Sequence, residues 1–306
     1  MWSYDDSRAA MRDVLRLSRA MTFKAAVADL PLGGGKGVMM LPAGVPLAAR
    51  VRRAALLDFA DTVDALGGSY ITAEDVGTSS RDMSLIASQT SFVAGLARGR
   101  GGSGDPSPFT ALGVEAAIRA CCERAFGSGD LRDRSVCVIG LGHVGARVAR
   151  RCARAGARLV ISDVDGAKRV LAADLGARWV TPRSALATRV DVLAPCALGG
   201  ALDDASVPSL RCAVIAGAAN NQLADDRVAD VLAARGILWA PDFVVNAGGL
   251  INIAEEFAIG GYDAGAARRR VWTIGDTLRG LFDEAEATGT TPLAVANAVA
   301  ERRLVR

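Results

Sequence analysis

The chain has 306 residues, about twice the length of a typical single domain, so two compact units and a sizeable hydrophobic core are expected. Hydrophobic residues make up 51% of the chain and charged residues 23%, and the net charge is only +3. This composition excludes a disordered chain and gives no reason to expect a nucleic-acid partner.

The histidine and cysteine content limits which metal sites, hydrolase active sites and disulfides the chain can form. His143 is the only histidine, so a histidine-rich metal site cannot form, and a serine or cysteine hydrolase would have to use this residue. No metal is therefore expected. The six cysteines show no CxxC spacing, the start MWSYDDSR is not a signal peptide, and no apolar stretch is long enough for a membrane span. We expect a cytoplasmic protein with reduced thiols that does not enter a membrane.

The N-terminal part of the chain reads as helices and short strands around a glycine-rich loop. Apolar residues at helical spacing predict a helix from Asp6 to Arg19. Residues 25–29 and 37–41 read as short strands on either side of the loop LPLGGGKG. Pro46 is expected to open a long helix that continues to about Ala65.

A strand and a third helix follow. Gly67 and Gly68 end the preceding helix, and SYITA at residues 69–73 reads as a strand. A helix is expected to begin near Arg81, with a serine or threonine available as its N-terminal cap.

A domain boundary is expected at residues 98–108, which are dense in Gly, Ser and Pro and show no periodicity. The first domain then covers residues 1–108 and the second covers 109–280. Residues 268–303 are helical in pattern, and we expect residues 281–306 to pack back on the first domain.

The second domain has the pattern of a doubly wound α/β fold. After a helix over about 110–126, short apolar runs alternate with helical stretches, as expected of buried parallel strands with crossover helices. The expected fold class is therefore α/β, with two domains and a cleft between them. The apolar runs are residues 136–139, 158–162, 190–194, 212–216 and 236–240.

A nucleotide-binding turn is indicated by VCVIGLGHVGARVAR. Gly140, Gly142 and Gly145 have GxGxxG spacing between a strand and a helix, which is the context that a dinucleotide pyrophosphate needs. His143 and Val144 lie inside this turn and are counted with the cofactor-binding residues, although a solvent-facing role for His143 is the ordinary alternative. Another alternative is a glycine turn that binds no nucleotide.

The cofactor is expected to be NAD. Asp163 ends the next strand, eighteen residues after Gly145, where its carboxylate can accept hydrogen bonds from the adenosine ribose hydroxyls. The same carboxylate would repel a 2′-phosphate, and no arginine immediately follows it, so NAD is favoured over NADP.

Two of the three lysines flank consecutive glycines in MTFKAAVADLPLGGGKG. Lys24 and Lys36 in one cleft would lower each other's pKa, and a lysine with a lowered pKa can act as a general base. Solvated surface lysines around a loop are the alternative. In ITAEDVGTSS, Asp75 lies before a turn closed by Gly77, where it is either a site residue or a cap of the next helix.

Seven ordered segments carry a resemblance that covers Met1 to about Glu256. The sequence resembles the leucine, phenylalanine and valine dehydrogenases of the glutamate dehydrogenase superfamily, which favours the functional interpretations of the lysines and of Asp75. The segments are MTFKAAVADLPLGGGKG, YITAEDVGT, GGSGDPSPFTALGV, VIGLGHVG, LAPCALGG, VIAGAANNQL and APDFVVNAGGLIN.

The resemblance implies a first domain for substrate binding and oligomerisation and a second that binds NAD, with an L-amino acid in the cleft. It implies that Lys24 binds the α-carboxylate and that Lys36 is the general base that activates water. It also implies that Asp75 exchanges protons with the amino group, aided by the Glu74 carbonyl, and that Asn246 helps to bind substrate. The implied cofactor contacts are Thr110 at the carboxamide and Cys196, Ala197, Asn220 and Asn221 along the nucleotide.

The activity that follows is reversible NAD-dependent oxidative deamination of an apolar L-amino acid to its 2-oxo acid and ammonia. Ala73 precedes Asp75 by two residues in an expected strand, so both would face the cleft, and alanine there favours leucine or valine over phenylalanine. A homo-oligomer, either a dimer or an octamer, is implied.

The enzymes that the sequence resembles carry a further N-terminal segment, so if Met1 is the true start we expect an incomplete first sheet and an exposed edge. Two alternatives therefore remain. One is a relative that binds NAD or an amino acid without catalysis, and the other is a glutamate dehydrogenase.

Overall fold

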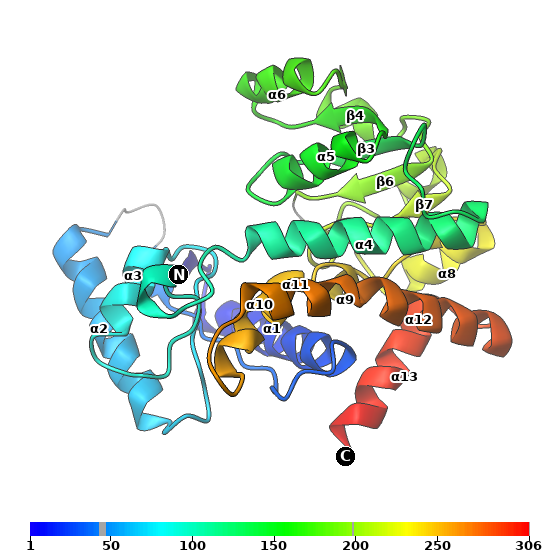
Figure 1. Cartoon of the computed structure of the whole chain (residues 1–306). Helices are drawn as coiled ribbons and strands as arrows, with labels where there is room; N and C mark the ends of the chain where they lie inside the picture. The colour runs from blue at the N-terminus through cyan, green and yellow to red at the C-terminus, as the bar shows by residue number, and fades with distance from the viewer. Residues whose placement is uncertain (43–46, 198, 306) are drawn as a thin grey trace.

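The computed structural model describes residues 1–42, 47–197 and 199–305 and shows an α/β chain. The helices α2 (Ala49–Ala65) and α3 (Ser80–Ile86) lie beyond the first turn of the long helix α4 (Ser107–Phe126), as Figure 1 shows. The large parallel sheet lies on the other side of that figure, alongside α4. The expected α/β class is confirmed.

The N-terminal unit contains a small sheet and a small core of its own. The strands β1 (Trp2–Ser3) and β2 (Met40–Leu41) pair in parallel, with Trp2 opposite Met40. The core lies between α2 and α3 and excludes water from their facing sides. Its buried residues are Leu56, Ala60, Met83, Ile86 and Val93.

Helix α1 (Ser7–Val27) is longer than the sequence pattern indicates. Asp6 caps it, accepting a hydrogen bond from the Ala9 N–H at 2.7 Å. The strand expected over 25–29 is wrong, because α1 continues to Val27 and a turn follows. Ala25 and Val27 are buried in the same hydrophobic cluster as the large sheet, so tertiary packing extends the helix.

Two other expected strands are largely wrong. Of residues 37–41, only Met40 and Leu41 form a strand, and of residues 69–73 only Thr72 forms a bridge, to Val93. A strand needs a neighbour for its backbone hydrogen bonds, and among the described residues these segments find almost none.

The expected helix ends in this unit are mostly confirmed. The helix expected from Pro46 is α2, and Pro46 itself lies outside the described residues. Gly67 and Gly68 follow α2 with φ angles of 56° and 88°, which glycine adopts without strain. Ser79 caps α3 in a reciprocal capping box with Asp82, as expected of a serine there.

The six-stranded sheet has the order β5-β4-β3-β6-β7-β8, and all its strands are parallel. The chain runs outward from β3 to β5 and then returns to β6 on the other side of β3. The point where the order reverses is where open α/β sheets bind ligands. The strands are β3 (Ser135–Ile139), β4 (Arg158–Ser162), β5 (Arg178–Trp179), β6 (Val192–Pro195), β7 (Val214–Ile215) and β8 (Leu238–Trp239).

The five strands expected from the apolar runs are confirmed, and β5 was not expected because two residues give no readable pattern. Alternate residues of β3 enter two cores: Val136 and Val138 face one, and Cys137 faces the other. The elements between the strands are α5 (Gly145–Arg154), η2 (Gly166–Lys168), α6 (Arg169–Asp174), α7 (Pro182–Ala185), η3 (Val207–Ser209) and α8 (Arg227–Ala234), and β8 is followed by α9 (Asp242–Val245), α10 (Gly248–Ala254) and η4 (Glu255–Phe257).

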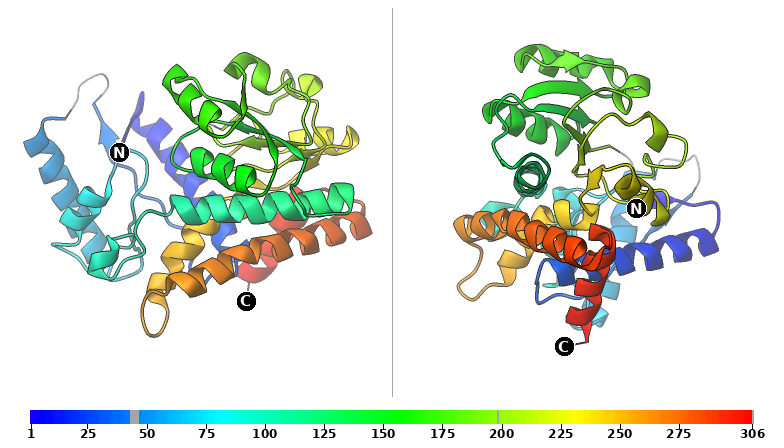
Figure 2. Two further views of the ribbon diagram at one scale, coloured as in Figure 1. Left: turned by 45° about the horizontal axis from the view of Figure 1, so that its top comes forward. Right: turned by 90° about the vertical axis from the view of Figure 1, so that its right-hand side faces the viewer.

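The C-terminal helical stretch is three helices, not one. These are α11 (Ala264–Trp272), α12 (Ile274–Thr288) and α13 (Pro292–Leu304). Gly289, with φ of 65°, ends α12, and Pro292 lies in the first turn of α13. Helix α12 runs alongside α4, and α13 packs on α1 (Figure 2).

The segment that connects the two units is held by one carboxylate. Glu256 Oε1 accepts hydrogen bonds from the N–H groups of Gly95 at 2.9 Å and Ser103 at 2.7 Å. Between them lies the short 3₁₀ helix η1 (Arg98–Arg100). Helix α4 then begins at Ser107, earlier than the expected Thr110, because Pro108 suits a first helical turn. Within the described residues, no helix is both long and apolar enough to cross a bilayer.

We expect that Arg303→Ala lowers the free energy of unfolding by about 1–2 kcal/mol, the range for hydrogen bonds from a charged donor that is partly exposed. Arg303 Nη1 on α13 donates to the carbonyls of Ala26 at 2.8 Å and Val27 at 2.9 Å, at the open end of α1. Urea unfolding followed by circular dichroism measures the change. Arg302→Ala is the control, since Arg302 pairs with exposed Glu284 on the neighbouring helix. Equal losses in both variants would contradict this role of Arg303.

Candidate functional site

The glycine-rich turn joins β3 to α5 at the carboxyl edge of the sheet. Gly140 has a φ angle of 92°, and a side chain on Gly145 would collide with the Gly140 carbonyl. A methyl group on Gly142, in contrast, would meet no described atom within 4 Å. The turn is therefore closed on the protein side and open at Gly142, above the N-terminus of α5. This shape fits a dinucleotide pyrophosphate.

The register of β3 and β4 brings Asp163 to this turn. Ile139 lies opposite Ser162, so the residues that follow the two strands are neighbours. Asp163 Oδ2 accepts a hydrogen bond from the Leu141 N–H at 2.6 Å, inside the glycine turn, and Oδ1 accepts one from the Asp165 N–H at 2.9 Å. Lys168 Nζ lies 3.0 Å from Oδ2.

The Asp163 carboxylate is held in its charged form. Burial alone would raise its pKa, but the hydrogen bonds from Asp165, Leu141 and Lys168 outweigh burial, and the pKa is lowered. Lys168 did not emerge from the sequence as a site residue. Its position five residues after Asp163, across a short turn, was the available signal.

The remaining turn residues are placed as follows. His143 is exposed, and its carbonyl accepts a hydrogen bond from Arg147 at 2.6 Å, whereas Val144 is half-buried at the N-cap of α5. Cys196 and Ala197 follow β6 and lie against Gly140 and Gly145. Burial raises the pKa of the Cys196 thiol to about 11, so the thiol stays protonated near neutral pH.

Three further residues expected at the cofactor lie at the edges of the same region. Thr110 is in the first turn of α4, where its hydroxyl donates to the Pro106 carbonyl at 3.2 Å, and it lies beside Gly249. Asn220 and Asn221 follow β7, and both are exposed. Asn221 has a φ angle of 51°, which asparagine tolerates better than most residues.

Lys24 meets the nucleotide-binding unit through two asparagines. Lys24 Nζ, near the end of α1, donates to Asn220 Oδ1 at 3.2 Å, and Asn246 Nδ2 donates to the same oxygen at 2.8 Å. Asn246 Nδ2 also donates to the Ala218 carbonyl at 3.2 Å. Asn246 is buried, and its Oδ1 has no hydrogen-bond partner among the described residues. Lys24 and Asn246 are thus linked through their shared acceptor, Asn220 Oδ1.

The Lys24 ammonium is destabilised by its surroundings. Burial lowers its pKa to about 8, the buried carboxylate of Asp242 acts in the opposite direction, and the positive charge of Lys36 lowers it further. The mutual lowering expected between the two lysines is thus present at Lys24, although burial is its main cause. A negatively charged ligand would stabilise the protonated form.

Lys36 and Asp75 form an ion pair in the N-terminal unit. The Lys36 side chain is half-buried, and burial lowers its pKa, although the carboxylate of Asp13 acts in the opposite direction. A lysine of this kind is a better proton acceptor near neutral pH than an exposed one. Its partner Asp75 is half exposed, so protons can exchange with solvent through the pair.

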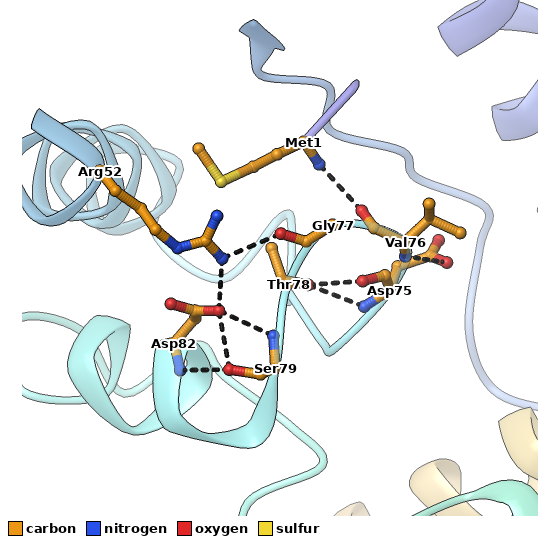
Figure 3. A network of polar contacts seen from close by, with 8 residues as sticks. All are labelled: Met1, Arg52, Asp75, Val76, Gly77, Thr78, Ser79 and Asp82. Atoms are coloured by element: carbon orange, nitrogen blue, oxygen red, sulfur yellow. Dashed lines mark hydrogen bonds and ion pairs between the residues drawn. The ribbon is translucent and has the colours of Figure 1, made fainter. Parts of the chain in front are cut away.

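The turn that carries Asp75 is fixed by a network of hydrogen bonds (Figure 3). Thr78 Oγ1 accepts from the Asp75 N–H at 3.0 Å and donates to the Asp75 carbonyl at 2.7 Å. Arg52 on α2 donates to the Gly77 carbonyl at 2.9 Å and pairs with Asp82 on α3 at 2.6 Å. Asp75 therefore caps no helix, since Ser79 has that role, and the turn is held from two helices.

Ala73 and Glu74 lie immediately before this turn. Ala73 is half-buried and Glu74 is exposed. Because no strand forms beyond the Thr72 bridge, a shared face for Ala73 and Asp75 does not follow from strand alternation. The role of Ala73 stays a prediction.

The residues described above include two ammonium groups, Lys24 and Lys36, the carboxylate of Asp75, and the amide of Asn246. Such a set can bind a carboxylate and move protons. Among the described residues, no three histidine, cysteine, aspartate or glutamate side chains are grouped to hold a metal ion.

Family models match most of the chain. Residues 3–92 match the model "Glu/Leu/Phe/Val dehydrogenase, dimerisation domain", and residues 167–260 match "Glutamate/Leucine/Phenylalanine/Valine dehydrogenase". Residues 116–198 also match the NAD-binding domain of D-isomer specific 2-hydroxyacid dehydrogenases. The expected NAD cofactor and its domain are thereby confirmed.

Individual relatives cover nearly the whole chain. The chain is 39% identical to a leucine dehydrogenase of Bacillus cereus over 305 residues, 99% of this chain and 82% of the relative. It is 41% identical to a valine dehydrogenase of Streptomyces virginiae over 307 residues, 99% of this chain and 84% of the relative.

A solved structure of similar fold is the L-tryptophan dehydrogenase from Nostoc punctiforme, with a TM-score of 0.84 and 38% identity over 99% of this chain and 85% of that one. A hetero-hexameric glutamate dehydrogenase from Thermus thermophilus, solved in a Leu-bound form, has a TM-score of 0.80 and 27% identity, covering 95% of this chain and 77% of that one. The chain belongs to the Glu/Leu/Phe/Val dehydrogenase family.

Proposed function

We propose that this chain catalyses the reversible, NAD-dependent oxidative deamination of an apolar L-amino acid. The amino acid, NAD⁺ and water give the 2-oxo acid, ammonium, NADH and a proton. One observation carries the proposal: Lys24 from α1 and Asn246 from the nucleotide-binding unit meet at Asn220, and no described residue forms a hydrogen bond with the buried Asn246 Oδ1. This pairing of a cation with an acceptor suits the α-carboxylate and the α-ammonium of one amino acid.

The nucleotide region fits NAD on structural grounds. Gly142 is open where the pyrophosphate would lie, and Asp163 stands beside the turn where the adenosine ribose would lie. Thr110, Cys196, Ala197 and Asn221 are proposed to line the rest of the dinucleotide. When bound, NAD accepts a hydride from the substrate Cα and thereby leaves that carbon open to attack by water.

The chain's own residues bind the substrate and move protons. Lys24 pairs with the α-carboxylate, and Asn246 Oδ1 accepts a hydrogen bond from the amino group. Lys36, whose pKa is lowered by burial, takes a proton from the attacking water. Asp75, its ion-pair partner, exchanges protons with the departing amine, with the Glu74 carbonyl as a further acceptor.

The substrate is proposed to be aliphatic, of the leucine or valine type. Leucine, tryptophan and valine dehydrogenases are 39%, 40% and 41% identical to the chain, so identity alone does not separate small from large side chains. We assign the choice to Ala73, because a methyl group near the substrate side chain would disfavour an aromatic ring.

The two alternatives have less support. Glutamate dehydrogenases of known structure are at most 27% identical to the chain among the relatives compared, which makes that activity less favoured. A non-catalytic role gives no reason for Lys36 and Asp75 to be paired beside Lys24.

We also propose a homo-oligomer, a dimer or an octamer. The match to a dimerisation domain and the exposed apolar residues Trp2, Met11 and Leu15 support it.

We expect Lys36→Ala to lower kcat by about 10²- to 10⁴-fold, the usual contribution of a general base, while NADH still binds. Lys24→Ala should mainly raise KM, because a carboxylate partner acts in the ground state and the transition state alike. NADH formation with leucine gives kcat and KM, and fluorescence titration gives NADH binding. An active Lys36→Ala enzyme without added amines would remove Lys36 from the mechanism.

Substrate binding should weaken as the pH rises through about 8. Lys24 binds a carboxylate only when protonated, and its pKa is lowered to about 8, so its ammonium is present below that pH and lost above it. The inhibition constant of 4-methylpentanoate, which lacks an amino group, measures this without titration of the ligand. In Lys24→Arg the side chain stays charged, so the alkaline limb should disappear. If binding in Lys24→Arg still weakens above pH 8, the titrating group is not Lys24.

Ala73→Gly should raise the kcat/KM ratio of phenylalanine to leucine by about tenfold or more, because one methyl group in a closed pocket is worth roughly 1–3 kcal/mol. Initial rates with both substrates measure the ratio. Ala97→Gly, in the exposed loop before η1, controls for added backbone flexibility. A wild-type enzyme that prefers phenylalanine would show that the assignment of Ala73 is wrong.

A further inference from the structure

Lys168 is the one lysine that the amino-acid site does not use. It ends η2, five residues after Asp163, and its Nζ lies 3.0 Å from Asp163 Oδ2. The Asp163 carboxylate is almost fully buried, whereas the Lys168 side chain is 35% exposed. The ammonium therefore covers the solvent side of the carboxylate.

The carboxylate already has other donors. The Leu141 N–H binds Oδ2 and the Asp165 N–H binds Oδ1, so neither backbone contact depends on Lys168. These contacts fix Asp163 against the glycine turn. Lys168 consequently adds a partly exposed positive charge to a negative charge that is fixed without it.

The Asp163–Lys168 pair changes the charge next to the proposed position of the adenosine ribose, which we call the ribose edge. A lone aspartate repels a phosphate on the ribose 2′-oxygen, which is the usual reason that an aspartate here selects NAD over NADP. The positive charge of Lys168 offsets that repulsion, and its ammonium is a direct hydrogen-bond donor to a phosphate. Asp165 contributes less, because its exposed carboxylate caps η2 through the Ala167 N–H at 3.0 Å.

We propose that Lys168 sets the discrimination between NAD and NADP, by moving from Asp163 to the 2′-phosphate so that the chain binds NADP as a second, weaker cofactor. This inference rests on the proposed nucleotide site around Gly142 and Asp163. It assigns to Lys168 a contact with the cofactor and no part in proton transfer.

Arg169 provides a matched control. It is the next residue and carries the same charge, but its guanidinium lies 5.5 Å from the centroid of the Trp179 ring. Removing its charge changes the net charge of this segment equally without touching Asp163. Lys168→Gln and Arg169→Gln therefore separate a local contact from a general electrostatic effect.

The experiment measures the dissociation constants of NADH and NADPH by calorimetry for the wild type, Lys168→Gln, Arg169→Gln, Asp163→Asn and the double variant Asp163→Asn/Lys168→Gln. In Lys168→Gln we expect the dissociation constant of NADPH to rise about tenfold more than that of NADH, the size of one charge-assisted hydrogen bond. Asp163→Asn should lower the dissociation constant of NADPH relative to that of NADH. The double variant should lose this gain, because it lacks the Lys168 ammonium that would contact the 2′-phosphate. Arg169→Gln should leave the ratio unchanged.

A second titration isolates the ribose edge. Adenosine 2′,5′-bisphosphate and 5′-AMP differ only in the 2′-phosphate, so their affinity ratio should follow the same pattern without the nicotinamide half. Circular dichroism melting checks that each variant is folded. If Asp163→Asn does not fold, comparing Lys168→Gln with Arg169→Gln still tests the proposal.

The outcomes distinguish this inference from the proposed function. If Lys168→Gln binds NADH normally and its ratio of NADPH to NADH dissociation constants is unchanged, the proposed role of Lys168 is wrong. The same holds if Arg169→Gln changes this ratio as much as Lys168→Gln does. Neither result would affect the proposed function. A folded wild-type protein that binds neither nucleotide would overturn the nucleotide site itself, and this inference with it.

Discussion

The burial of the last turn of α1 against the nucleotide-binding unit is the constraint on which the site depends. Ala25, Ala26 and Val27 lie in the same hydrophobic cluster as the residues of β3 and α4, although more than eighty residues separate them along the chain. Lys24 directly precedes these residues, so their burial sets its position. The same burial removes water from its ammonium, lowers its pKa, and places it at Asn220.

The other parts of the site are held by polar contacts of the backbone. Asp163 is fixed by the N–H groups of Leu141 and Asp165, and the Asp75 turn is fixed by Thr78 and Arg52. In both cases hydrogen bonds fix the position of a charged group, and of the two carboxylates Asp75 stays half exposed whereas Asp163 is almost fully buried. The site thus combines side chains fixed in both units, and Glu256 holds the connecting segment through the N–H groups of Gly95 and Ser103.

The sequence predicted local features well where a single residue imposes a conformation. Ser79 caps α3, Gly67 and Gly68 end α2, and the β3 to α5 turn has the expected glycine geometry, because a cap or a positive φ angle is a property of a few adjacent residues. The parallel strands were also readable, since strands buried on both faces must be continuously apolar. Residues 25–29 were misread because tertiary packing extends α1 to Val27, and residues 69–73 were misread because only Thr72 finds a bridging partner.

What the sequence determined by itself is the α/β class, the nucleotide turn with Asp163, and the residue types available for the chemistry. The tertiary structure decided which of them meet. No local pattern indicates that Lys24 reaches Asn220, or that the buried Asn246 Oδ1 has no hydrogen-bond partner among the described residues. Those contacts join segments whose separation is fixed by the packing of whole helices and by strand register. The free energy that specifies them is spread over the core, so it leaves no signature in the few residues that make the contact.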